Sequence, residues 1–159
     1  MMDFENIVSN QQSLVQAAGA ILSERSLNLG TADTLPAAFQ AVGTPFKDVG
    51  RGGPLFCFVK VTETFDSAGD AVTCKVALVS ADNAALDSNL TVIYETAAIA
   101  QAVLLAGYQF LLGSVPPGIT QQYLGFRYTT AVADATAGKV YGAFTPTPNG
   151  TVRVVGAGS

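Results

Sequence analysis

Apolar and polar residues alternate along several short stretches of this chain, with the two-residue period of β-strands. The runs 55–64 and 71–80 are rich in Val, Phe and Thr and flank a short Asp/Ser/Gly segment, which is the pattern of a β-hairpin. The simplest register places Phe58 opposite Leu78 and Lys60 opposite Val76. Because both faces are apolar near the open end of this hairpin, we expect that end to be buried on two sides and the turn to project into water.

Similar runs predict further strands over 25–29, 90–95, 108–112, 121–132, 139–145 and 151–155. A turn at 134–138 joins two of them as a second predicted hairpin. Helix is expected only as fragments, over 3–16 behind a possible Asp3 N-cap and over 97–106 before Gly107. About seven or eight strands at short intervals predict an all-β protein, specifically a β-sandwich of the jelly-roll type.

The predicted organisation has three parts: an N-terminal segment or arm over 1–24, the sandwich over 25–145 and a C-terminal extension over 146–159. Within the sandwich, residues 31–54 form a long loop rich in Pro and Gly, and long loops in compact domains usually have a task. We expect this loop to lie over the open end of the first hairpin. Phe39 and Phe46 are its candidate apolar anchors, and Arg51 is available to bind a carboxylate or carbonyl oxygens.

Charged residues make up 13% of the chain, about half the ~25% of ordinary soluble domains. Such a surface is either merely uncharged or partly covered by other protein. The net charge is −4, and the eight Lys and Arg are scattered, which argues against nucleic acid. The N-terminus lacks the basic start of a signal peptide. The uncharged stretch 96–126 is interrupted by glutamines and prolines, so we expect no membrane span.

The chain has no histidine, which removes imidazole-assisted nucleophilic catalysis and the commonest zinc ligand. Its acidic residues fall in turns and polar loops, so we expect no enzyme, catalytic residue, metal or cofactor. The polar loop 81–89 lacks the glycine and closing glutamate of an EF-hand and is expected to be a solvated connection. Cys57 and Cys74 fall on opposite faces in the predicted register, and we expect both to be buried and reduced.

Several sequence fragments occur in a characteristic order: LNLG at 27–30, DVGRGGPL at 48–55, ADNAA at 81–85, LAGY at 105–108, PPG at 116–118, YLGFRY at 123–128 and TAGKV at 136–140. Together they resemble the Bbp16-like capsid cement proteins of tailed bacteriophages. The resemblance implies a jelly-roll domain that binds the outside of an assembled capsid and braces the joints between its subunits. The chain departs from that pattern in a longer segment between Gly30 and Asp48 and in its continuation past Thr145.

The implied protein is a structural virion component of the outer capsid surface, made in the host cytoplasm. Its expected partners are the major capsid protein and further copies of itself, as a dimer or trimer, without nucleic acid or membrane. We expect the contact surface to come from the N-terminal segment and the 31–54 loop, with Phe4, Ile7, Phe39, Phe46 and Arg51 as interface residues. The alternatives are a ligand- or receptor-binding head of a virion fibre, with an aromatic-lined pocket, and an enzyme with a buried carboxylate pair.

Overall fold

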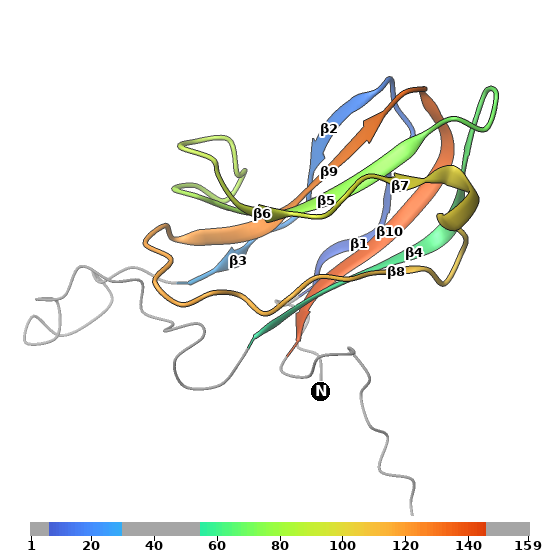
Figure 1. Cartoon of the computed structure of the whole chain (residues 1–159). Coiled ribbons are helices and arrows are strands. Elements are labelled where there is room, and N and C mark those ends of the chain that lie inside the picture. Colours follow the sequence, from blue (N-terminus) through green and yellow to red (C-terminus); the bar gives the residue numbers. More distant parts are fainter. Residues whose placement is uncertain (1–6, 30–54, 146–159) are drawn as a thin grey trace, which may run out of the picture.

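The computed structural model describes residues 7–29 and 55–145, which form two antiparallel β-sheets packed face to face (Figure 1). Sheet A contains, in spatial order, β1 (Ile7–Ser13), β10 (Ala135–Thr145), β4 (Phe56–Ser67) and β8 (Gln109–Phe110). Sheet B contains, in spatial order, β2 (Gly19–Leu22), β9 (Tyr123–Ala131), β5 (Thr73–Ala81) and β6 (Thr91–Glu95). Two short strands extend sheet B: β3 (Leu27–Asn28) pairs with β9, and β7 (Ile99–Ala100) pairs with β5.

This strand order is that of a jelly roll. The chain changes sheet at the connections from β1 to β2, β3 to β4, β4 to β5, β7 to β8, β8 to β9 and β9 to β10. It stays in sheet B from β2 to β3 and from β5 through β6 to β7. Within the described ranges, helix amounts to the three-residue 3₁₀ turn η4 (Gln101–Val103). The predicted fold class, an all-β sandwich of the jelly-roll type with short helical fragments, is therefore confirmed. The 31–54 loop lies outside the described residues.

Both predicted hairpins are wrong, because their strands belong to different sheets. Phe58 in β4 lies opposite Ala143 of β10, whereas Leu78 in β5 lies opposite Phe126 of β9. The connection after β4 bends back through Gly69 (φ +83) and Asp70 (φ +52) and enters the second sheet. The second predicted hairpin fails in the same way, since β9 pairs with β5 while β10 pairs with β4 and β1. Short polar connections mark both hairpins and sheet-crossing turns, so the sequence pattern alone does not separate them.

The predicted helix over 3–16 is wrong in its described part, where residues 7–13 form strand β1. Gln11 has a positive φ of 53°, and the register of β1 against β10 shifts twice. These bulges change the period at which side chains turn inward, so the apolar positions imitate a helical stripe. The predicted helix over 97–106 is also wrong, because β7 and the single turn η4 occupy that stretch.

The remaining strand predictions hold with shorter bounds: β3 within 25–29, β6 within 90–95, β8 within 108–112, and β9 within 121–132. Strand β10 begins at Ala135, four residues earlier than predicted. β1 and β2 place residues of the predicted N-terminal segment in both sheets, through pairing with β10 and β9. The predicted strand over 151–155 lies outside the described residues.

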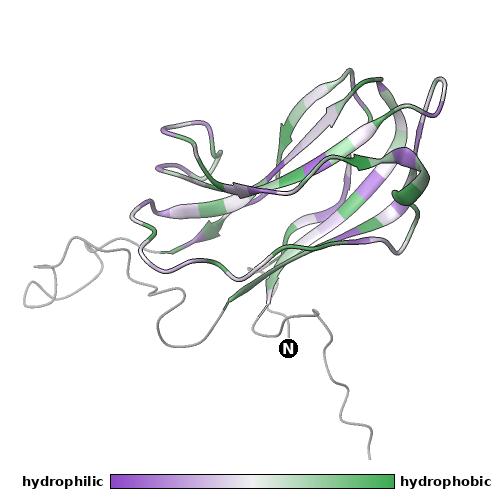
Figure 2. Cartoon of the chain, in the orientation of Figure 1, coloured by the Kyte–Doolittle hydropathy of each residue, from purple (hydrophilic) through white to green (hydrophobic). Residues whose placement is uncertain are grey.

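Aromatic side chains from both sheets fill the core. Phe126 of β9 stacks on Phe144 of β10, with ring centroids 4.9 Å apart and planes at 22°. Figure 2 shows the alternation of hydrophobic and hydrophilic residues along the strands that makes one face of each sheet apolar. A buried polar group lies beside these rings: Ser9 Oγ donates to Gln12 Oε1 (2.7 Å), so the Tyr128 hydroxyl, 2.8 Å away, donates to Ser9. Every polar atom of this contact has a partner, as a buried site requires.

Both cysteines lie in this core as free thiols, Cys57 from sheet A and Cys74 from sheet B. Burial raises the pKa of each thiol to about 12, which keeps both protonated and unreactive at neutral pH. The expectation of buried, reduced cysteines is confirmed. Their predicted placement on opposite faces of one hairpin is wrong, because the two side chains face the same interior from opposite sheets.

The outer face of sheet B is also buried at one end. Ala77, Val79 and Ala81 of β5 form a second apolar cluster with Leu86 from the 82–90 loop. The loop is held by its own side chains, since Asn83 Oδ1 accepts the amides of Asp87 (3.1 Å) and Ser88 (3.2 Å). The predicted burial on two sides is confirmed for β5, where the 82–90 loop supplies cover. The 31–54 loop, which was predicted to cover this end, lies outside the described residues.

Gly125 on β9 is the position where Leu86 approaches the sheet most closely. A Cβ atom added there would collide with Leu86 Cδ1 and lie 2.7 Å from Ser23 Oγ. We expect Gly125→Ala to lower the free energy of unfolding by about 1–3 kcal/mol, the usual cost of overpacking, as measured by urea denaturation. Gly113→Ala is the matched control, because nothing lies within 4 Å of a Cβ there. If Gly125→Ala and Gly113→Ala lower the free energy of unfolding equally, the close packing of Leu86 on Gly125 is not the cause of the loss.

Candidate protein-binding surface

One end of sheet A carries a row of apolar side chains across three strands. Ile7 of β1 lies opposite Ala143 of β10, which in turn lies opposite Phe58 of β4. Phe58 also contacts Tyr141, with ring centroids 6.3 Å apart in an edge-on arrangement. Because Val8, Val59 and Phe144 face the core, the alternation of the strands places this row on the outer face of the sheet. Ala143 and Phe58 are nevertheless buried, at 0% and 8% exposed, and Ile7 is half-buried, so the row itself offers little open apolar surface.

Of the predicted interface residues, the structure places Ile7 in this row. Phe4, Phe39, Phe46 and Arg51 lie outside the described residues, so their role as contacts stays a prediction. The described ends of three segments meet at this end of sheet A: Ile7 follows residues 1–6, Phe56 comes two residues after 30–54, and Thr145, opposite Phe56, precedes 146–159. All of the predicted contact residues are thus joined covalently to one end of the sandwich.

A carboxylate with two cationic neighbours lies on the outer face of sheet B. Glu95 of β6 accepts from Lys75 of β5 (2.7 Å) and from Arg127 of β9 (3.3 Å). These two cations, chiefly the Lys75 hydrogen bond, hold the pKa of Glu95 below its usual value. On sheet A, Lys139 pairs with Glu63 at 2.5 Å. Lys75, Arg127 and Lys139 are therefore each paired with a carboxylate within the chain.

The lowered pKa of Glu95 makes a pH-dependent contribution to stability. The contribution is complete above the ordinary glutamate pKa of 4.5 and is lost as pH falls through the lower pKa of the folded state. We expect the melting temperature of Glu95→Gln to lie below that of the wild type at neutral pH, and the gap to close in acid. Thermal unfolding across the acid range checks this, and salt near 1 M should narrow the gap at neutral pH. A difference in melting temperature between the two proteins that does not change with pH would contradict this contribution of Glu95.

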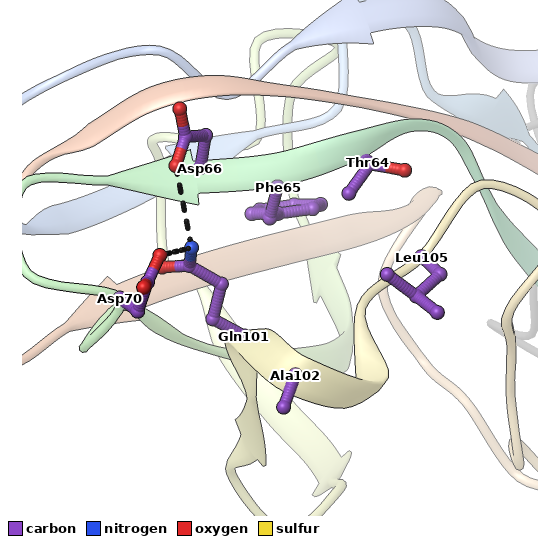
Figure 3. Close-up of a pocket in the computed structure, with 7 residues that line it drawn as sticks. All are labelled: Thr64, Phe65, Asp66, Asp70, Gln101, Ala102 and Leu105. Atoms are coloured by element: carbon purple, nitrogen blue, oxygen red, sulfur yellow. Dashed lines mark hydrogen bonds between the residues drawn. The ribbon is translucent and has the colours of Figure 1, made fainter.

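A shallow pocket of about 570 Å³ opens beside the end of β4 and contains two carboxylates (Figure 3). The Gln101 amide donates to Asp70 Oδ1 (2.9 Å) and Asp66 Oδ1 (3.4 Å), and its carbonyl accepts from Ser67 Oγ (2.6 Å). Both aspartates are exposed, unlike the buried pair that a glycosidase of this kind needs. The arrangement ties the β4–β5 connection to η4, and the pocket contains one aromatic side chain, Phe65.

Two exposed valines lie at the end of the sandwich remote from Ile7. Val15 is 51% exposed in the β1–β2 connection, and Val132 is 76% exposed in the β9–β10 connection. The two connections are held together, because Gln16 and Ala135 form a β-bridge and Ala18 N donates to Asp134 Oδ1 (2.9 Å). Sequence reasoning missed this pair. A valine in the connection Ala131–Val132–Ala133 is not distinctive in the sequence, and what marks it is the positive φ of Val132.

Among residues 7–29 and 55–145, no three His, Cys, Asp or Glu side chains gather in a way that could hold a metal ion. Over the same residues, no helix has the length and apolar character needed to cross a bilayer.

Two antiparallel sheets in jelly-roll order, with a closely packed aromatic core, define the molecule as a jelly-roll β-sandwich protein. A family model for Bbp16 matches residues 17–144, which covers the described sandwich except residues 7–16, where β1 lies, and Thr145. The chain belongs to the Bbp16 family, which is phage-related. No curated protein matches the chain significantly.

Proposed function

We propose that this protein is a structural component of a phage virion that binds the outside of the assembled capsid and reinforces contacts between capsid subunits. Membership of a phage-related family over residues 17–144 is the observation that carries the proposal. Its expected partners are the major capsid protein and further copies of itself, at the outer capsid surface. The protein has no proposed catalytic role.

The physical properties of the described sandwich support this role. The chain has few charges, and Lys75, Arg127 and Lys139 are paired within it. Such a surface can approach another protein without desolvating many unpaired ions, a step that costs free energy. The apolar row at Ile7 lies where three further segments of the chain begin or end. A protein present in many copies on a shell needs little affinity per contact, because linked contacts strengthen one another.

The proposal is tested by the two phenylalanines of the 30–54 segment. We expect the double variant Phe39→Ala/Phe46→Ala to occupy purified capsids at least about tenfold more weakly, because aromatic anchors dominate protein interfaces, while its melting temperature stays nearly unchanged. Co-sedimentation with capsids that lack the protein measures occupancy. A large fall in melting temperature would show that the two rings belong to the core, and wild-type protein that stays in the supernatant would refute capsid binding itself.

A fibre-head function has less support. It predicts a shallow pocket lined by several aromatic rings with polar groups directed into it. Among the residues that line the pocket at Gln101, Phe65 is the one aromatic residue, and its ring is buried. The second pocket of the described part, between the 82–91 stretch and residues 116–121, has no aromatic lining residue.

A further inference from the structure

Val132 has a backbone conformation that valine rarely adopts. Its φ is +75°, in the left-handed region where the Cβ of a β-branched residue crowds the backbone and where Gly, Asn and Asp are usual. The side chain is 76% exposed, so packing within the described sandwich offsets little of this strain. When a residue keeps an unfavourable backbone conformation and no packing within the fold offsets its cost, a functional constraint on that residue is indicated.

The two connections beside Val132 are largely uncharged, although the exposed Asp66 and Asp70 lie at the same end of the sandwich, where β4 ends opposite the start of β10. Val15 is exposed in the adjoining connection, and the stretches 13–23 and 129–133 contain no charged residue. The nearest acidic side chain, Asp134, is engaged as an acceptor for the amide of Ala18 at 2.9 Å. We call Val15 and Val132 together the valine tip. A partner surface that contacts the two valine side chains directly is itself apolar there, because a polar group would lose water without gaining a hydrogen bond.

The size of the valine tip indicates which partner it meets. A standard interface between two proteins involves roughly 20–30 residues on each side, far more than two side chains at the ends of two connections. The tip is therefore too small to hold two copies of this chain together by itself. It suits one contact among several on a shell, where other contacts fix the protein in place.

We propose that the valine tip inserts into an apolar depression on the outer capsid surface and forms a second capsid contact, separate from the one at the Ile7 end. This inference rests on the proposed function. Strand β10 runs from the tip region at Ala135 to Thr145 over 11 residues, so the two ends lie about 30 Å apart at ~3.3 Å per residue. A brace must touch both sides of a joint, and two contacts at this separation allow the protein to bind two neighbouring capsid subunits.

The test compares three versions of the full chain for binding to purified capsids that lack the protein. Val132→Asn relieves the strain, because Asn tolerates positive φ, and removes the apolar contact. We expect its melting temperature to be unchanged or about 2–4 °C higher, its apparent Kd for capsids to rise about tenfold or more, and its stabilisation of the capsid against heat to be lost. Val132→Ile keeps the apolar contact and should bind like the wild type. Leu111→Asn, which changes a 91% exposed residue beside β8, should also bind normally.

The outcomes separate this inference from the proposed function. Wild-type protein that fails to bind capsids refutes the proposed function. If the wild type binds and Val132→Asn binds equally well and stabilises the capsid equally, the valine tip is not a contact and the inference is wrong. If Val132→Asn lowers the mass of the free protein in solution, the tip joins copies of this chain, which also overturns the inference. Weak binding by Val132→Asn with intact mass and fold supports it.

Discussion

Replacement of Phe126 with alanine is expected to lower the free energy of unfolding by about 3–5 kcal/mol, the usual cost of truncating a buried phenylalanine. Phe126 is fully buried and joins the two sheets, because its ring stacks on that of Phe144 in the other sheet, with centroids 4.9 Å apart. The ring of Tyr128 lies beside it, with centroids 6.4 Å apart. Its removal leaves a cavity between two large rings that cannot close without moving β9 toward β10. Since domains are stable by about 5–15 kcal/mol in total, the variant should be near the limit of folding.

Urea denaturation of the purified protein measures this loss. Leu111→Ala is the control, since Leu111 is 91% exposed and such surface changes usually remain within about 0.5 kcal/mol. A loss below about 1.5 kcal/mol for Phe126→Ala would mean that the inter-sheet stack is not the centre of the core.

Gly142 on β10 is the site of the second large effect. A Cβ atom there would lie 2.6 Å from the Tyr128 hydroxyl and 3.0 Å from Phe126 Cδ2. To make room, Tyr128 must give up its hydrogen bond with Ser9, which is 2.8 Å long and fully buried. We expect Gly142→Ala to cost about 2–4 kcal/mol, from overpacking together with a buried polar group left unpaired.

A double-mutant cycle isolates that collision. Tyr128→Phe removes the hydroxyl that lies closest to the added Cβ. Gly142→Ala should therefore cost less in the Tyr128→Phe background than in the wild type, with a coupling of about 1 kcal/mol or more, as is common for residues in contact. Equal costs in the two backgrounds, measured by chemical denaturation, would contradict the collision.

Strand positions could be predicted from the sequence more readily than strand partners. The stretch 121–132 contains β9, in which every second residue from Leu124 to Thr130 is buried, so the period of two is visible in the sequence. β1 could not be recognised, because its register shifts between Ile7 and Ser9 and again between Ser9 and Gln12. Pairing depends on contacts between distant parts of the chain, such as Phe58 with Ala143, and a short connection does not show whether it turns within one sheet or crosses to the other.

For the predicted interface residues, the structure gives only the position of Ile7. Ile7 lies on an apolar row at one end of sheet A, while the aromatic residues expected beside it fall outside the described residues. The valine tip could not be found from composition, because its signal is a backbone angle. A valine in a turn is unremarkable until φ at Val132 is known to be positive.

The most direct test of the proposed function is an electron cryomicroscopy map of purified capsids incubated with the protein. The account predicts density for the β-sandwich on the outer surface of the shell, with its two ends over different capsid subunits. Bare shells at saturating protein, or density confined to the inside of the capsid or to the tail, would contradict it.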